Sequence, residues 1–188
     1  MNRLPSDDHI AWRDVFGNTH PVELEIGPGR GDALLGFARA APGTNFFAIE
    51  RLPAAAEAIM QRASRHALTN VRVIGGDARC IVASLVADAS VTAYHIYFPD
   101  PWPKTRHRRR RLATVEFGHS LRRTLLSGGM VHLASDLRDL VEETCDAFSR
   151  AGLVRALDAV PPAGRATTVF ERKYAGAGTH YARLLRPT

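Results

Sequence analysis

The stretch Val22-Glu23-Leu24-Glu25-Ile26-Gly27-Pro28-Gly29-Arg30-Gly31 decides the fold predicted for this chain. Its first five residues read as a short apolar strand. The glycines that follow allow a tight turn against which a ligand can lie. Residues 32–41 then have helical spacing, with Pro42-Gly43 as a stop signal. A helix that begins directly behind a glycine turn offers unpaired N–H groups to such a ligand.

Predicted strands and helices alternate along the rest of the chain. Strands are expected at 46–50, 70–74, 91–98 and 130–134, and helices at 53–67, 81–87, 112–126 and 139–151. The segment from Leu153 onward is expected to form strands around Pro161-Pro162. The alternation predicts an α/β fold with a mostly parallel, doubly wound sheet and an antiparallel C-terminal strand. Ligands of such sheets bind beyond the carboxyl ends of the strands.

Length and composition narrow the class of protein. The 188 residues, 45% of them hydrophobic, suffice for one core, and we expect a single domain with residues 1–20 as a short N-terminal arm. No apolar run approaches the length of a membrane span, and charged residues interrupt the first twenty positions. Two cysteines cannot form a disulfide framework or a cysteine-rich zinc site. We therefore expect a cytoplasmic protein that uses neither a membrane nor a metal, as a monomer or a homodimer.

Carboxylates stand at successive strand ends. Glu50 ends the second strand, where its forked oxygens can accept both hydroxyls of a ribose. Asp77 follows the third strand, where it can accept from an adenine amine, cap the next helix, or do both. The G-x-G-x-G spacing of the first turn differs from the dinucleotide pattern and is more typical of S-adenosylmethionine sites. A tight turn and a surface glutamate are the structural alternatives, but together these features favour an adenosine-bearing ligand.

The fourth strand runs into Phe98-Pro99-Asp100-Pro101-Trp102-Pro103-Lys104-Thr105-Arg106-His107. Three prolines in five residues make this loop rigid. Six fixed cations fall in the eight residues from Lys104 to Arg111, within a chain of net charge +6. Such a cluster attracts nucleic acid, with Trp102 available for stacking on a base. The alternatives are a solvated basic helix end and a tryptophan buried in the core.

Two further carboxylates suit a guanine. Asp136 follows the fifth strand, and Glu171 lies late in the chain within Thr167-Thr168-Val169-Phe170-Glu171. Each could accept from the N–H donors on the edge of a guanine ring. A helix cap at Asp136 and an edge-strand position for Glu171 account for them equally well, so both interpretations stay open.

In this order, the glycine turn, the F-P-D-P-W-x-K-x-R-H stretch, Ser135-Asp136 and Thr168-Val169-Phe170-Glu171 resemble the bacterial tRNA (guanine-N7-)-methyltransferases. The proline–tryptophan stretch is the specific part of the resemblance, which extends from about Val22 to Leu185. The resemblance implies a Rossmann-like class I methyltransferase fold. It also implies S-adenosyl-L-methionine as cofactor and a guanosine in the tRNA variable loop as substrate.

The resemblance also implies roles for individual residues. Asp100 becomes the proposed catalytic residue. The positions implied to bind the cofactor are Glu25, Gly27, Gly29, Gly31, Glu50, Asp77 and Asp100. The positions implied to bind tRNA are Trp102, Lys104, Arg106, His107, Arg110, Asp136, Thr168, Val169, Phe170 and Glu171.

Two C-terminal motifs depart from the family pattern. Leu137 stands where the family usually has a tryptophan after Asp136, and the late segment from Gly178 to Leu184 lacks the usual acid. These departures and the short N-terminal arm motivate one alternative, a related methyltransferase acting on another RNA or a smaller guanine-bearing molecule. The cationic run would equally serve a second alternative, a tRNA-binding protein without catalysis.

Overall fold

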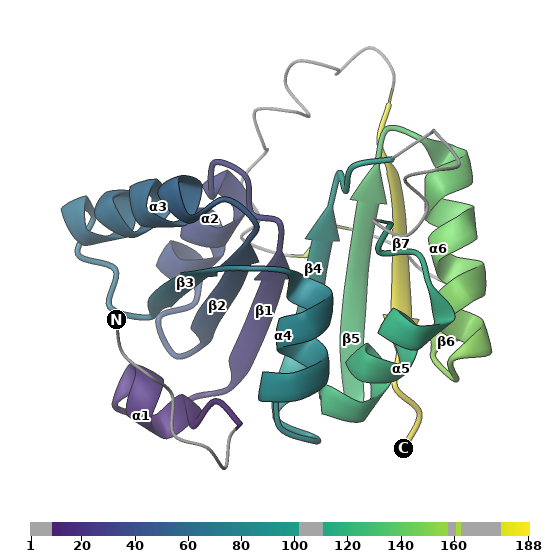
Figure 1. The fold of residues 1–188 in the computed structure, drawn as a ribbon, viewed down its shortest axis with the longest axis horizontal. Helices are drawn as coiled ribbons and strands as arrows, with labels where there is room; N and C mark the ends of the chain where they lie inside the picture. The colour runs from purple at the N-terminus through teal and green to yellow at the C-terminus, as the bar shows by residue number, and fades with distance from the viewer. Residues whose placement is uncertain (1–8, 102–110, 158–160, 163–177) are drawn as a thin grey trace.

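The computed structural model describes residues 9–101, 111–157, 161–162 and 178–188. Its centre is a seven-stranded sheet in the order β3-β2-β1-β4-β5-β7-β6 (Figure 1). The strands are β1 (Val22–Ile26), β2 (Asn45–Glu50), β3 (Val71–Gly75), β4 (Val91–Tyr97), β5 (Leu125–Ser135), β6 (Val154–Arg155) and β7 (His180–Leu185). The pairings among the first five strands are parallel, and β7 is antiparallel to both β5 and β6. The predicted α/β fold with a mostly parallel sheet is confirmed.

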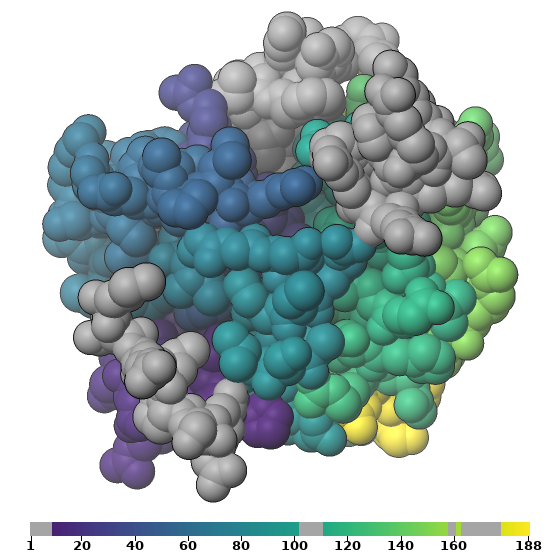
Figure 2. Space-filling view, viewed as in Figure 1, coloured from purple at the N-terminus to yellow at the C-terminus, as the bar shows by residue number. Residues whose placement is uncertain are grey.

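Helices cover both faces of this sheet. They are α1 (Trp12–Phe16), α2 (Asp32–Ala40), α3 (Pro53–Arg65), α4 (Ala78–Leu85), α5 (Val115–Thr124) and α6 (Arg138–Arg150). Apolar residues of α4, α5 and α6 share one core cluster, whereas those of α2 and α3 share another with the opposite face of the sheet. In the space-filling view, α4 and α5 form the surface in front of the sheet (Figure 2). None of the helices in the described ranges is long and apolar enough to cross a membrane.

Side-chain alternation along the strands explains the two cores. Phe47 and Ile49 of β2 join the cluster beneath α4 and α5, whereas Phe46 and Ala48 join the cluster beneath α2 and α3. All six residues of β2 are buried because the strand is covered on both faces. The near-continuous apolar run at 46–50 is therefore explained by the position of β2 inside the sheet.

Capping residues set the helix starts, and here the sequence-based boundaries need correction. The expected helix at 81–87 begins at Ala78, because the Asp77 side chain accepts a hydrogen bond from the Arg79 N–H. The expected helix at 112–126 is shorter, because Thr114 caps its start and the chain becomes extended at Leu125.

Two further differences from the expected elements come from long-range packing. The strand expected at 130–134 begins at Leu125, which pairs with Val91 of β4 across an irregularity in register. Helix α1 was not expected within the polar opening. It is held by Trp12, whose ring packs edge-on against Phe47 at a centroid distance of 5.0 Å.

Gly31 fixes the junction between the glycine turn and α2. Its φ of 74° lies in the left-handed region, and an added Cβ would come within 2.8 Å of Cγ2 of the buried Ile59. Backbone conformation and lack of space therefore both require glycine at this position.

Gly31→Ala should lower the free energy of unfolding by about 1–3 kcal/mol, because it adds both left-handed strain and overpacking. Urea denaturation of the purified protein measures this loss. The matched control is Gly43→Ala, where an added Cβ would meet nothing within 4 Å. A loss at Gly31 no larger than that of the control would contradict the assignment.

Candidate active site

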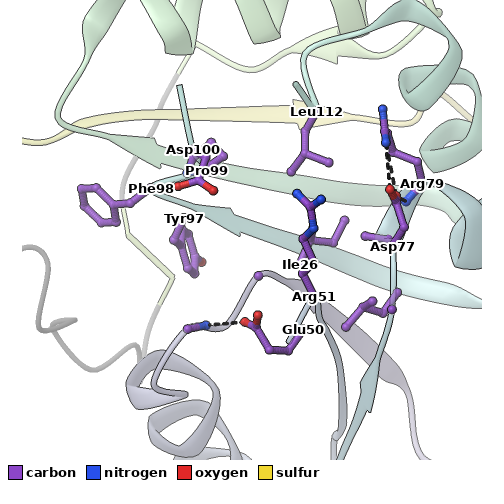
Figure 3. Close-up of a pocket in the computed structure, with 15 residues that line it drawn as sticks. Ile26, Glu50, Arg51, Asp77, Arg79, Tyr97, Phe98, Pro99, Asp100 and Leu112 are labelled. Carbon is purple, nitrogen blue, oxygen red and sulfur yellow. Dashed lines mark hydrogen bonds and ion pairs between the residues drawn. The ribbon is translucent and has the colours of Figure 1, made fainter. Parts of the chain in front are cut away.

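A cavity of about 320 Å³ opens at the carboxyl ends of the parallel strands (Figure 3). It lies where the strand order reverses, since β1 pairs with β2 on one side and β4 on the other. Its walls come from the turn after β1, the ends of β2 and β4, and the start of α4. The lining residues are Ile26, Gly27, Gly29, Ile49, Glu50, Arg51, Gly76, Asp77, Ala78, Arg79, Tyr97, Phe98, Pro99, Asp100 and Leu112.

Glu50 anchors the glycine turn. One carboxylate oxygen accepts from the Gly29 N–H at 3.1 Å, and the other accepts from the Leu52 N–H at 3.1 Å. The residue is only 8% exposed, so these bonds supply polar partners that water cannot fully provide. Since each carboxylate oxygen has a second lone pair, Glu50 can still accept from two adjacent hydroxyls.

Asp77 and Arg79 form an ion pair in the cavity wall (Figure 3). Asp77 Oδ1 accepts from the backbone N–H of Arg79 at 2.9 Å and from its Nε at 3.2 Å, while Oδ2 accepts from Nη2 at 2.8 Å. The side-chain hydrogen bond from Arg79 is the main reason the pKa of Asp77 lies below its ordinary value. Asp77 thus caps α4 and also lines the cavity.

The end of β4 directs Asp100 to the cavity. The N–H of Phe98 donates to the Ala134 carbonyl at 2.7 Å, and its φ of 49° lies in the left-handed region. A bulky residue with this φ is strained, and such strain clusters at functional sites. The resulting bend leaves Pro99 and Asp100 in the cavity wall, with Asp100 itself exposed (Figure 3).

The structure gathers five of the seven residues expected to bind the cofactor: Gly27, Gly29, Glu50, Asp77 and Asp100. Glu25 is 4% exposed at the end of β1 and is not one of the lining residues. Gly31 packs against Ile59 of α3 instead. The roles of these residues toward a cofactor stay predictions.

The expected tRNA-binding positions are only partly described. Asp136 lies half-buried directly after β5, and its Oδ1 accepts from the Ser135 hydroxyl at 3.4 Å. The others lie outside the described residues: Trp102, Lys104, Arg106, His107, Arg110, Thr168, Val169, Phe170 and Glu171.

Several lining residues were not expected from the sequence, among them Arg51, Arg79, Tyr97 and Leu112. Arg51 directly follows Glu50, and Arg79 comes two residues after Asp77. Proximity to an expected carboxylate was therefore an available signal for both. Leu112 stands next to no expected carboxylate and carried no such signal.

The lining residues fit S-adenosylmethionine. The cavity falls within the size range of small-molecule sites. An added Cβ at Gly27 or Gly29 would meet no atom of the described residues within 4 Å, so the turn borders the open space of the cavity. Among the described lining residues, three carboxylates stand beside two guanidinium groups, and this excess of negative charge suits a ligand that bears a sulfonium and an ammonium against one carboxylate. Within the described ranges, no cluster of three His, Cys, Asp or Glu side chains could hold a metal ion.

Comparison with known proteins also indicates a methyltransferase. The family model Methyltransf_4, described as "Putative methyltransferase", matches residues 19–183. The solved structure of the 16S rRNA methyltransferase KamB superimposes with a TM-score of 0.70 at 16% identity, covering 100% of this chain and 96% of that one. A second structure, titled "Structure of an Antibiotic Related Methyltransferase", gives a TM-score of 0.68 at 14% identity, covering 100% of this chain and 96% of that one.

Curated relatives are much more similar in sequence. The tRNA (guanine-N(7)-)-methyltransferase of Aliivibrio fischeri (strain MJ11) is 36% identical over 169 residues, which are 87% of this chain and 71% of that protein. The enzyme of the same name from Geobacter metallireducens is 42% identical over 128 residues, which are 68% of this chain and 61% of that protein.

Fold and cavity together define an S-adenosylmethionine-dependent methyltransferase of the α/β class. Within that class, the sequence similarity is specific. The chain belongs to the tRNA (guanine-N7)-methyltransferase family.

Glu50→Ala should weaken binding of S-adenosylhomocysteine at least about tenfold, because it removes two charge-assisted hydrogen bonds that hold the turn as well as the expected ribose acceptor. Isothermal titration calorimetry measures the affinity. The control is Glu57→Ala on α3, which changes an exposed glutamate outside the cavity lining. Unchanged affinity in Glu50→Ala would contradict the role of Glu50.

Arg79→Ala should raise the pKa of Asp77, because it removes the group mainly responsible for lowering it. A carboxyl whose pKa is lower in the folded protein stabilises the fold above its unfolded pKa, and this contribution disappears as the pH falls through the folded pKa. The wild type therefore keeps it to lower pH than the variant does. A carboxyl-carbon NMR titration reads the Asp77 pKa in both proteins, and equal values would contradict the ion pair.

Proposed function

We propose that this protein methylates guanine N7 in tRNA. The observation that carries the proposal is the placement of Asp100 in the wall of the cavity that Glu50 and Asp77 also line. The names of its relatives, at 36% identity and above, support guanine N7 as the methylated atom and tRNA as the substrate. Asp136 after β5 and the cations from Lys104 to Arg111 supply chemistry suited to a guanosine in RNA.

The reaction requires little chemistry from the side chains of the protein itself. When bound, S-adenosylmethionine supplies a methyl group activated by a positively charged sulfur. Guanine N7 has a lone pair and no proton, so no side chain has to act as a general base. The protein must instead align the reacting groups, which can contribute up to about 7–11 kcal/mol in ideal cases.

In this proposal Asp100 acts through position and charge. It comes immediately after the strained turn at Phe98, and Pro99 and Pro101 flank it. Proline restricts the backbone on both sides and so limits how the carboxylate can move. A fixed negative charge stabilises positive charge that develops on the guanine ring during transfer. Glu50 and the glycine turn hold the other end of the cofactor.

Asp100→Ala should reduce methylation of tRNA transcripts by at least about a hundredfold, the scale on which single electrostatic groups act in catalysis. Transfer of tritiated methyl from S-adenosylmethionine to bulk tRNA, followed by nucleoside analysis, measures the rate and identifies the product. Asp146→Ala, an exposed aspartate on α6, is the control.

The same assay separates the alternatives. N7-methylguanosine in the tRNA variable loop supports the proposal, and wild-type rates in Asp100→Ala would overturn the role of that residue. A labelled product in a different RNA would favour a related methyltransferase. Salt-sensitive tRNA binding without cofactor affinity would favour a binding protein that lacks catalysis.

A further inference from the structure

The two faces of the sheet differ in chemistry along β1, β4 and β5. On the side of α4, α5 and α6, these strands present apolar or aromatic side chains, namely Leu24, Ile26, Tyr94, Ile96, Val131 and Leu133. Alternate positions of the same strands place Glu23, His95, Tyr97 and His132 on the opposite face. Buried strands usually carry apolar residues there, because an unpaired polar group in the interior is costly. A polar cluster at this place therefore needs its own explanation.

Three members of the cluster form a continuous hydrogen-bonded chain. Oε2 of Glu23 lies 2.7 Å from Nε2 of His95, and Nδ1 of His95 lies 2.7 Å from the hydroxyl of Tyr97. His95 is 1% exposed and Tyr97 6% exposed, whereas the Glu23 side chain is 28% exposed. The chain thus runs from a half-exposed carboxylate on β1, through a buried imidazole, to a buried phenol at the end of β4.

The chemistry of the groups identifies the donor of the hydrogen bond between His95 and Glu23. A carboxylate only accepts hydrogen bonds, so Nε2 of His95 carries the proton and donates to Glu23. Nδ1 of His95 and the Tyr97 hydroxyl share the second hydrogen bond, in which the donor depends on the tautomer of the ring. The His95 ring is also held from other sides. It stacks on His132 with a centroid distance of 5.2 Å and an interplanar angle of 8°, and its centroid lies 4.7 Å from that of the Phe37 ring on α2.

His132 adds an uncharged ring to this arrangement. Burial, with His95 and Arg183 nearby, lowers the pKa of His132 to about 3, so His132 is uncharged at neutral pH. The stacked rings of His95 and His132 form a stiff support behind Nδ1. The Tyr97 hydroxyl therefore bonds to a ring that is itself held in place, and this hydrogen bond restrains the position of the Tyr97 side chain.

Tyr97 is the member of the chain that lines the cavity. It lies between the Pro99–Asp100 segment and the hydrogen bond from Gly29 to Glu50 (Figure 3). Glu23, His95 and His132 are absent from the lining. We propose that Glu23 and His95 are positioning residues that act through Tyr97, fixing its ring as the wall of the cofactor cavity beside Asp100.

This inference rests on the cofactor assignment within the proposed function and extends it to residues behind the cavity. A fixed ring removes part of the ordering cost that binding would otherwise incur, so the effect belongs to cofactor affinity. Glu23 reaches this site from a strand 72 positions earlier in the sequence than His95. Because Glu23 is not among the described lining residues, we expect a substitution there to change affinity through the chain or through general destabilisation.

A double-mutant cycle on the full-length protein separates these two routes. The probe is S-adenosylhomocysteine, with affinity measured by calorimetry in the absence of RNA. Tyr97→Phe and Glu23→Ala should each weaken binding about three- to tenfold, the equivalent of one hydrogen bond. The double variant should bind as weakly as Tyr97→Phe alone, because the hydroxyl through which Glu23 acts is already gone.

Conservative replacement provides a second readout. Glu23→Gln keeps an acceptor oxygen for His95 Nε2 and should restore affinity to within about twofold of the wild type. The matched control is Thr92→Val, which removes another β4-to-β1 hydrogen bond, from the Thr92 hydroxyl to the Val22 carbonyl at 2.8 Å. If Glu23→Ala does not fold, His95→Gln takes its place in the cycle.

Equal losses for Glu23→Ala with and without the Tyr97 hydroxyl would overturn the proposal, as would unchanged affinity in Glu23→Ala. A loss of the same size in Thr92→Val would also overturn it, because the effect would then be general destabilisation. Since the measurement uses no RNA, a protein that binds the probe but does not methylate tRNA would overturn the proposed function and leave this inference standing.

Discussion

The hydrogen bond from the Gly29 N–H to the Glu50 carboxylate joins the two strand ends on which the site depends. It forms because β1 and β2 are parallel and in a register that sets Ile26 against Ile49. The backbone continues the junction, with the Gly27 N–H donating to the Ile49 carbonyl at 2.9 Å. The same carboxylate that shapes the turn also lines the cavity. Loss of Glu50 would therefore alter both the shape of the cavity and its charge.

Local sequence was enough to predict the parts of the site that arise within one strand–turn–helix unit. The glycine turn, Glu50, Asp77 and Asp100 each stand at the end of a recognisable strand or just beyond it, and in a parallel sheet such positions meet at one edge. Capping also acts locally, which is why Asp77 could be assigned two compatible roles. The structure shows the cap, and the role of Asp77 toward adenine stays a prediction.

The remaining parts depend on contacts between distant segments. Helix α1 exists through the packing of Trp12 on Phe47, and the early start of β5 depends on pairing with Val91. The chain from Glu23 to Tyr97 requires the register between β1 and β4 as well as the side-chain alternation of both strands. Residues 22–26 were recognisable as a strand in the sequence, but nothing local identified His95 as the partner of Glu23.

Glu50 and Asp77 are held in a different way from Asp100, and the difference matches the role proposed for each part of the cavity. Glu50 is buried with a backbone donor on each oxygen, and Asp77 is clamped by Arg79 and by the start of α4. Rigid acceptors of this kind suit an adenosine group, which must be read by shape and hydrogen bonds. Asp100 is exposed and is positioned by the strained turn at Phe98. A methyl transfer to a nitrogen without a proton requires no buried acid or base there, and an accessible carboxylate leaves room for a large substrate to approach.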